Sequence, residues 1–135
     1  MIERIRLEAQ GQGLFELTDS LVEIVERSGV EEGLCTLFVQ HTSASLVIQE
    51  NADPRARRDL ERWLARLVPE DDPLYTHTQE GSDDMPAHVK AALTATTLSI
   101  PIEAGKLLLG TWQGVFLWEH RRDAGTRTVI VQLMP

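Results

Sequence analysis

Two histidines and three carboxylates stand close together in the segment HTQEGSDDMPAH, which covers residues 77–88. Imidazoles and carboxylates are the side chains that most often bind metal ions or transfer protons in enzymes. The glycine and serine in the middle of the segment allow a sharp turn that would gather these groups. Two interpretations stay open: the segment is a site, or it is a surface loop in which Asp83 or Asp84 caps a helix that begins near Met85.

Two further segments, QHTSAS and GTWQGVFLWEH, carry histidines in otherwise apolar surroundings. In an extended QHTSAS, His41, Ser43 and Ser45 lie on one side of the strand. A catalytic serine is disfavoured, because no G-x-S-x-G motif is present and neighbours two apart on a strand diverge from the geometry of proton transfer. A His41 that faces a ligand or a metal is better supported than a catalytic Ser43. In the alternative interpretation, the hydroxyls of Thr42, Ser43 and Ser45 only form hydrogen bonds within a tight turn. From the residues alone, His120 is a surface histidine near a hairpin.

Composition excludes several classes of function and location. The formal charge is −8, from 13 lysines and arginines against 21 aspartates and glutamates, and an acidic chain repels the phosphates of nucleic acids. No apolar run is long enough to span a bilayer and the charged N-terminus does not resemble a signal peptide, so we expect a cytoplasmic protein without membrane association. The only cysteine, Cys35, cannot form an internal disulfide, and its apolar neighbours predict a place in the core.

Three segments have the apolar spacing of amphipathic helices. The first is capped by one of residues 18–20 and ends at Gly29. The second opens with Asp53 as its cap and Pro54 in its first turn, and Pro69 stops it. The buried stripe predicted for the second helix is Leu60, Trp63, Leu64 and Leu67. The stripe predicted for the third helix, with His88 at its edge, is Met85, Val89, Ala92 and Leu93.

The remaining apolar segments alternate or run continuously, as strands do. Residues 34–39 are nearly all apolar, which predicts a strand covered on both faces. Other strands are predicted at residues 5–9, just after residue 13, and at residues 46–48, 98–102, 107–109, 112–118 and 129–133. The succession of strands at the C-terminal end implies antiparallel pairing. We therefore predict one α+β domain, residues 1–135, with an antiparallel or mixed sheet system.

The runs HTSASL, ENADP, HTQEGSDDMPAH and GTWQGVFLWEHR resemble motifs of the YjbQ family, and the resemblance spans residues 41–121. It implies an α+β domain with a two-sheet sandwich that forms a homotrimer. The apolar strands and tryptophans of the second half offer more sheet surface than three helices cover, which agrees with assembly. The resemblance also implies activity as a secondary thiamine-phosphate synthase. Ala52 replaces a cysteine of some relatives, which counts against a mechanism that needs that thiol.

Carried over position by position, the resemblance assigns roles to most polar side chains of these motifs. The metal ligands it implies are His41, His77, Asp83 and Asp84. The catalytic residues it implies are His88, Glu119 and His120. The ligand-binding residues it implies are Ser43, Asn51, Glu80, Gln113 and Arg121.

Thiamine-phosphate synthesis joins a pyrimidine methyl diphosphate to a thiazole phosphate and releases pyrophosphate. The charge of this leaving group must be offset, so we expect a divalent cation, with Mg²⁺ held by Glu80, Asp83 or Asp84. Arg121 and the amides of residues 110–114 would contact phosphate oxygens. Three histidines with a carboxylate would instead suit Zn²⁺ or another transition metal. The second possibility is a metal- or phosphate-ligand-binding protein with incidental synthase activity. The third, which the histidines in three separate segments disfavour, is a purely structural oligomer.

Overall fold

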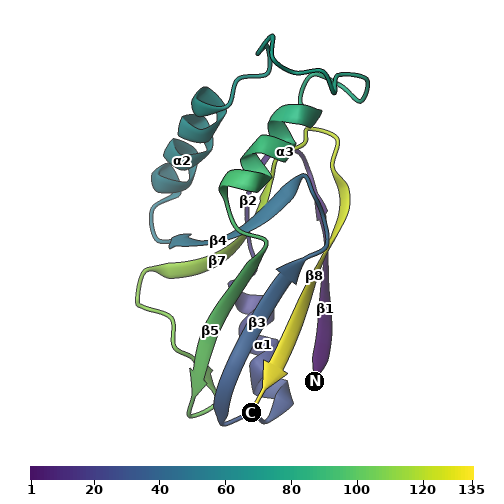
Figure 1. Ribbon diagram of the computed structural model, residues 1–135. Coiled ribbons are helices and arrows are strands. Elements are labelled where there is room, and N and C mark those ends of the chain that lie inside the picture. Colours follow the sequence, from purple (N-terminus) through teal and green to yellow (C-terminus); the bar gives the residue numbers. More distant parts are fainter.

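A computed structural model describes the whole chain, residues 1–135, as three helices and eight strands (Figure 1). The elements in chain order are β1 (Ile2–Ala9), β2 (Gly13–Glu16), α1 (Thr18–Ser28), β3 (Glu32–Val39), β4 (Ala44–Glu50), α2 (Pro54–Leu67), α3 (Asp84–Leu93), β5 (Thr97–Glu103), β6 (Lys106–Leu107), β7 (Gln113–Glu119) and β8 (Gly125–Met134). The predicted α+β class is confirmed. None of the three helices combines the length and the apolar character needed to cross a membrane.

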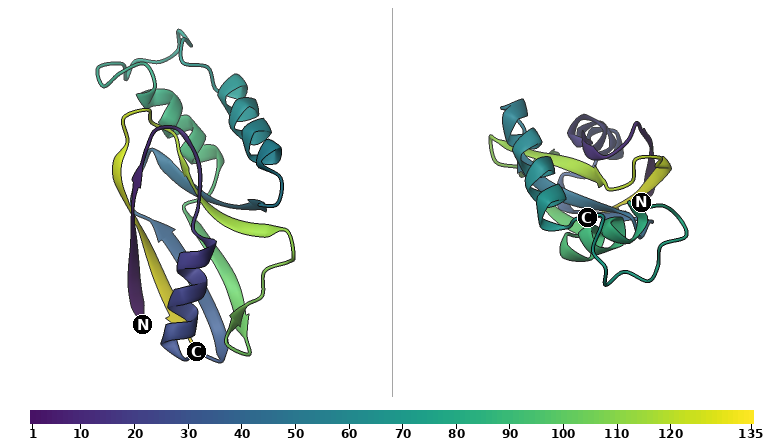
Figure 2. Two further views of the ribbon diagram at one scale, coloured as in Figure 1. Left: turned by 180° about the vertical axis from the view of Figure 1, so that it is seen from behind. Right: turned by 90° about the horizontal axis from the view of Figure 1, so that it is seen from above.

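The strands form two sheets, and every strand pair in them is antiparallel. The order in the five-stranded sheet is β1-β8-β3-β5-β6, and the order in the three-stranded sheet is β2-β7-β4. The alternative of a mixed sheet is therefore not realised. β1 lies beside β8, so the two chain ends come close together, and α1 lies on one side of the larger sheet while α2 and α3 lie together at the other end of the molecule (Figures 1 and 2).

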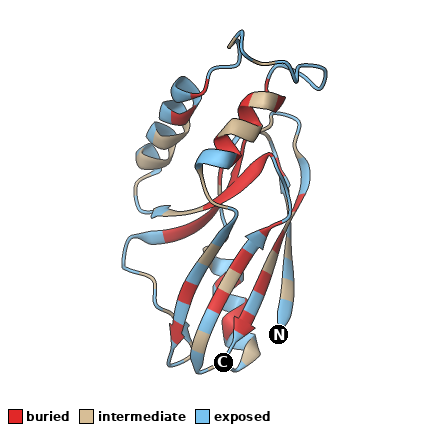
Figure 3. Cartoon of the chain, viewed as in Figure 1, coloured by how far each residue is buried: buried red, intermediate tan, exposed pale blue.

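The main core lies between α1 and the inner faces of the two sheets. Its members from α1 and β3 are Leu21, Ile24, Val25, Cys35, Leu37 and Val39. The prediction that β3 is covered on both faces is wrong: Leu34 and Phe38 are exposed, because no helix covers the outer face of this sheet (Figure 3). Cys35 is fully buried, which confirms it as a core residue, and this burial raises the pKa of its thiol to about 11.

β7 is the strand that is covered on both faces. Val115 and Leu117 point into the main core. Phe116 and Trp118 point the other way, into a second core closed by α2. Because β7 is central, its C-terminal end lies inside the protein. The polar residues Glu119 and His120 at this end are therefore buried.

The helix ends confirm one predicted cap and correct another. Asp53 accepts a hydrogen bond of 2.9 Å from the Arg55 amide and Pro54 opens α2, as predicted. α1 ends at Gly29 with a φ of 74°, also as predicted. Its N-terminus, however, has no side-chain cap. Thr18 instead lies inside the helix, where its hydroxyl donates to Glu16 and accepts from the amide of Val115, and this ties α1 to β7.

The predicted apolar stripes of α2 and α3 are largely wrong. In α2 only Leu64 is buried, while Trp63 and Leu67 are exposed. In α3 the predicted Ala92 and Leu93 are exposed. The face of α3 that is buried consists of Asp84, Pro86, Ala87, Lys90 and Ala91. This buried face includes the charged side chains of Asp84 and Lys90, so the spacing of apolar residues does not predict it.

Candidate metal centre and the polar network beside it

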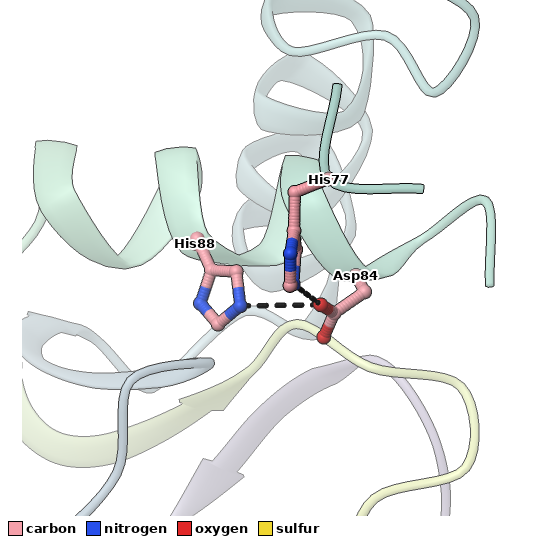
Figure 4. A group of neighbouring side chains, drawn as sticks. All are labelled: His77, Asp84 and His88. Carbon is pink, nitrogen blue, oxygen red and sulfur yellow. Dashed lines mark hydrogen bonds and ion pairs between the residues drawn. The ribbon is translucent and has the colours of Figure 1, made fainter. Parts of the chain in front are cut away.

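One ligand atom from each of His77, Asp84 and His88 lies within 4.8 Å of the other two (Figure 4). Asp84 and His88 are one turn apart on α3 and therefore share a face of that helix. His77 reaches them from the preceding loop, which turns at Gly81 with a φ of 111°. The Nε2 atoms of His77 and His88 lie 2.8 Å and 3.2 Å from the Oδ2 atom of Asp84. The sharp turn predicted for this segment thus gathers a three-residue cluster.

The second nitrogen of His88 determines how its ring faces Asp84. Nδ1 lies 3.0 Å from the backbone carbonyl oxygen of Thr42, with the Ser43 hydroxyl 3.4 Å away. A carbonyl oxygen only accepts hydrogen bonds, so Nδ1 carries a proton. In the neutral ring, the lone pair on Nε2 then faces the carboxylate of Asp84, and two acceptors repel at 3.2 Å unless a proton or a cation lies between them. A metal-bound histidine usually has this arrangement, with its other nitrogen donating to a carbonyl.

Arg121 holds the Asp84 carboxylate in place. Asp84 is only 1% exposed, and its Oδ1 atom lies 2.5 Å from Nη1 of Arg121. The same guanidinium contacts Asp83 at 3.3 Å and donates to the Glu80 carbonyl oxygen at 2.9 Å. Each of the three guanidinium nitrogens of Arg121 therefore has a partner in its own chain, and the contact with phosphate oxygens expected from the sequence stays a prediction. Glu80 takes part through its backbone, while its side chain is exposed.

Asp83 and Asp84 do not cap α3, so the capping interpretation is wrong. No side-chain cap hydrogen bond forms at Asp83, the residue before the helix. Asp83 instead accepts from the amide of Arg122 at 2.9 Å and pairs with Arg121. Burial acts to raise the pKa of Asp83, but the Arg122 amide and the two arginines outweigh it and hold that pKa below the ordinary value. Asp83 is thus committed to ion pairs and lies outside the three-residue cluster.

A second network surrounds Arg127, which is 6% exposed on β8. Arg127 contacts both carboxylate oxygens of Glu119, at 2.5 and 3.0 Å. Glu119 also accepts from the amides of His120 and Arg121. Removing one partner of such a buried ion pair costs about 3–5 kcal/mol of stability. Both oxygens of Glu119 therefore have structural partners, and the catalytic role expected of Glu119 stays a prediction.

His41 belongs to this second network and not to the cluster of His77, Asp84 and His88. Its Nε2 atom lies 2.8 Å from Nη1 of Arg127, and its Nδ1 atom accepts from the amide of Ser43 at 3.0 Å. Burial, and then the charge of Arg127, lowers the pKa of His41 below its ordinary value. Arg127 is not among the residues predicted from the sequence, although it continues the inward alternation of Val129, Val131 and Leu133 along β8.

His120 is buried, not the surface histidine that the residues alone favoured. It is 1% exposed, and its Nε2 atom lies 2.9 Å from the hydroxyl oxygen of Ser45. Burial, and then the charge of Lys90, lowers the pKa of His120 to about 3. No carboxylate orients the other ring nitrogen, so the Ser45–His120 pair lacks the third group that nucleophilic serine catalysis uses.

Asn51 and Gln113 lie far from the cluster. β4 and β7 pair so that Ala44 faces Glu119 at one end and Glu50 faces Gln113 at the other. The length of the paired strands separates these ends by about 20 Å. Asn51 donates to Glu16 at 2.9 Å, and Gln113 accepts from the amide of Gly110 at 2.7 Å. Within one chain, these two expected ligand-binding residues and the 110–114 loop cannot reach the ligands of the cluster.

The buried neutral His120 predicts a specific loss of stability in acid. The unfolded chain binds a proton at this ring below the ordinary pKa of 6.5, whereas the folded chain does so only near 3. Above a pH of 6.5 the ring is neutral in both states, so His120 does not change the free energy of unfolding. As the pH falls from 6.5 toward 3, the unfolded chain binds the proton more strongly, which should lower the free energy of unfolding by about 3–5 kcal/mol in all. Urea unfolding of the wild type and of His120→Gln, measured from neutral pH down to about pH 4, should give a smaller pH slope for the variant. Equal slopes would contradict this account of His120.

Relatives of known sequence match this chain along nearly its whole length. A protein of Synechocystis sp. named as a UPF0047 protein is 54% identical over 97% of this chain and 89% of its own. The UPF0047 protein YjbQ of Escherichia coli O157:H7 is 42% identical over 96% of this chain and 94% of its own.

Solved structures agree with the sequence comparison. A YbjQ-like protein of unknown function from Sulfolobus solfataricus has a TM-score of 0.90 at 27% identity, over 98% of this chain and 95% of that one. A conserved hypothetical protein from Thermus thermophilus has a TM-score of 0.86 at 36% identity, over 98% and 99% of the two chains. The family model described as UPF0047 protein YjbQ-like matches residues 3–135. The chain therefore belongs to the YjbQ-like UPF0047 family.

Proposed function

We propose that the protein binds a divalent transition-metal ion, Zn²⁺ in the first place, through His77, Asp84 and His88. The observation that carries this proposal is the Nε2 atom of His88, which faces Oδ2 of Asp84 at 3.2 Å while its Nδ1 atom faces a carbonyl oxygen. Two imidazoles and one carboxylate are a donor set that suits Zn²⁺. Mg²⁺ prefers a shell of oxygens, and Asp83 and Glu80 contribute no oxygen to the cluster.

The surroundings of the cluster fit a reactive metal more than a purely structural one. Three protein ligands leave a coordination position for water or substrate, whereas structural zinc sites use four. The His77 side chain is half exposed, so this position is open to solvent. The carbonyl oxygen of Thr42 orients the His88 ring, and Arg121 orients the Asp84 carboxylate. These contacts would keep the ligand geometry fixed when substrate binds. A cation here would act as a Lewis acid on a bound oxygen.

The reaction we propose is of the thiamine-phosphate synthase type. The bond between the pyrimidine methyl carbon and a diphosphate oxygen breaks, a bond between that carbon and the thiazole nitrogen forms, and pyrophosphate leaves. Arg121 is already paired with Asp84, so a metal cation bound at the cluster would be the group that offsets the charge of the diphosphate there. The alternative proposal is a metal- or phosphate-ligand-binding protein in which this activity is incidental.

Metal binding gives the first prediction from this proposal. Zn²⁺ affinity measured by calorimetry should fall at least ~10-fold in Asp84→Asn and in His88→Gln, because each variant loses one ligand. Glu80→Gln is the matched control, since it changes an exposed carboxylate of the same loop and should bind normally. Affinity should also fall from about pH 8 to about pH 5, because only neutral imidazole coordinates a metal. Unchanged affinity in both ligand variants would sink the proposed site.

Pyrophosphate release tests the transferase proposal separately. With Zn²⁺ or Mg²⁺ and both heterocyclic phosphates, the wild type should release pyrophosphate, and Asp84→Asn should do so at least ~100-fold more slowly. Glu80→Gln should stay close to the wild type. If the protein binds metal but releases no more pyrophosphate than Asp84→Asn, the transferase proposal fails and the binding-protein alternative stands.

We also propose that the protein is a homotrimer that uses the outer face of its five-stranded sheet. No helix covers this face, and Phe38 is 49% exposed on it. Its β3–β8 neighbours carry further apolar groups, since Leu34 faces Met134 and Phe38 faces Ile130. An apolar sheet face of this kind is typical of a protein–protein contact.

Sedimentation tests the assembly. The wild type at micromolar concentration should sediment as a trimer, and Phe38→Glu should dissociate because it buries a charge in the contact. Leu74→Glu is the control, because Leu74 is exposed in a loop away from the sheet. A monomeric wild type would remove the trimer proposal, and a trimeric Phe38→Glu variant would move the contact to another surface.

A further inference from the structure

A cavity of about 260 Å³ lies on the side of α3 away from the metal cluster. Lys90 follows His88 by two residues, which turns its side chain to nearly the opposite side of the helix. β2, α2 and β7 close the cavity. The side chains that matter for its chemistry are Gln12, Glu61, Arg62, Lys90, Trp118 and His120.

Lys90 brings an unpaired cation to this cavity. The residue is 6% exposed, and none of the ion pairs of the chain includes its ammonium group. The acids whose charge reaches it, Glu70 and Asp83, are already paired with Arg122 and Arg121. Arg57 Nε is the only side-chain nitrogen or oxygen that is both fully buried and without a partner, so the ammonium group of Lys90 still reaches the solvent of the cavity. A bound anion would give this ammonium group the ion-pair partner that the chain does not supply.

His120 supplies a second polar group to the same cavity. Its Nε2 atom is engaged with Ser45, while no protein group bonds its Nδ1 atom. When Nε2 accepts a hydrogen bond from the Ser45 hydroxyl, Nδ1 carries the ring proton and can donate a hydrogen bond to a ligand. A hydrogen-bond acceptor in the cavity would therefore select this tautomer.

The two carboxylates in the wall do not neutralise Lys90. Glu119 is committed to Arg127 and to two backbone amides. Glu61 accepts from the amide of Leu14 at 2.9 Å. Arg62 stands in the same wall but is exposed to solvent, so Lys90 is the one largely buried cation there without an ion-pair partner. One negative charge is enough to pair with it, so the expected ligand is a monoanion.

We propose that this cavity binds a small carboxylate, whose oxygens pair with Lys90 and accept a hydrogen bond from His120. This site is separate from the metal cluster and does not depend on the transferase activity. Trp118 and Leu64 provide the apolar part of the wall, against which the carbon end of the ligand lies. The ligand class is thus a short-chain monocarboxylate.

Titration with acetate and with inorganic phosphate tests the site at constant ionic strength, maintained with chloride. Acetate should bind the wild type more tightly than phosphate, and Lys90→Met should lose at least ~10-fold of the acetate affinity because the ion pair is gone. His88→Gln is the control, and it should bind acetate like the wild type because His88 faces the metal cluster. No acetate binding, equal binding by Lys90→Met, or tighter binding of phosphate would each overturn the proposal.

Mapping by NMR gives a second measurement that needs no variant. Acetate should shift the signals of Gln12, the Trp118 indole and the His120 ring in the wild-type protein, and leave those of His77 and His88 in place. Shifts that map to another surface would overturn the proposal even if Lys90→Met does not fold. A loss of affinity in Lys90→Met together with these local shifts would support it.

Discussion

A carboxylate can remain ionised inside a protein only if hydrogen bonds and positive charge compensate it. Arg121 contacts one oxygen of the buried Asp84 side chain, and His77 contacts the other, which His88 also faces. This requirement explains why the preceding loop folds back to bring His77 in, and why the residues after β7 turn toward α3 to bring Arg121 in. The cluster, the loop and the β7–β8 connection are therefore one structural unit built around the buried side chains of Asp83 and Asp84.

α3 carries charge on two sides, and this divides the polar residues of the chain into separate sites. Asp84 and His88 face the loop and Thr42, whereas Lys90 faces the cavity that contains His120. Between these sites, Glu119 and Arg127 form a fully hydrogen-bonded pair that positions the ends of β7 and β8. The charges that the family resemblance groups together thus serve different purposes, which we propose are metal binding, support and anion binding.

Predictions from the sequence were correct for features that neighbouring residues determine, such as helix ends and the alternation of strands. Asp53 with Pro54 predicted the start of α2, Gly29 predicted the end of α1, and alternation predicted most strands. The predictions failed where tertiary contacts override spacing. The buried face of α3 contains Asp84 and Lys90, so its apolar residues Ala92 and Leu93 gave a stripe on the wrong side.

The site was predicted in outline but not in its partners. The segment of residues 77–88 does hold the cluster, because its histidines and carboxylates are close in sequence and a glycine allows the turn. Which carboxylate faces the histidines depends on Arg121, which is distant in sequence, and the sequence alone gave equal weight to Asp83 and Asp84. His41 contacts Arg127 and not the cluster, and this contact depends on the register of β8 beside β3. The apolar periodicity of a sequence does not determine the register between strands.

X-ray absorption at the zinc edge tests the central claim most directly, because it reports the atoms bound to the metal without reference to activity. On protein loaded with one equivalent of Zn²⁺, we predict two imidazole nitrogens and at least one carboxylate oxygen at about 2.0–2.2 Å, with solvent oxygen completing the shell. In His88→Gln the imidazole contribution should drop by half. A shell made only of oxygen, or one that is identical in the wild type and His88→Gln, would show that His77, Asp84 and His88 are not a metal site.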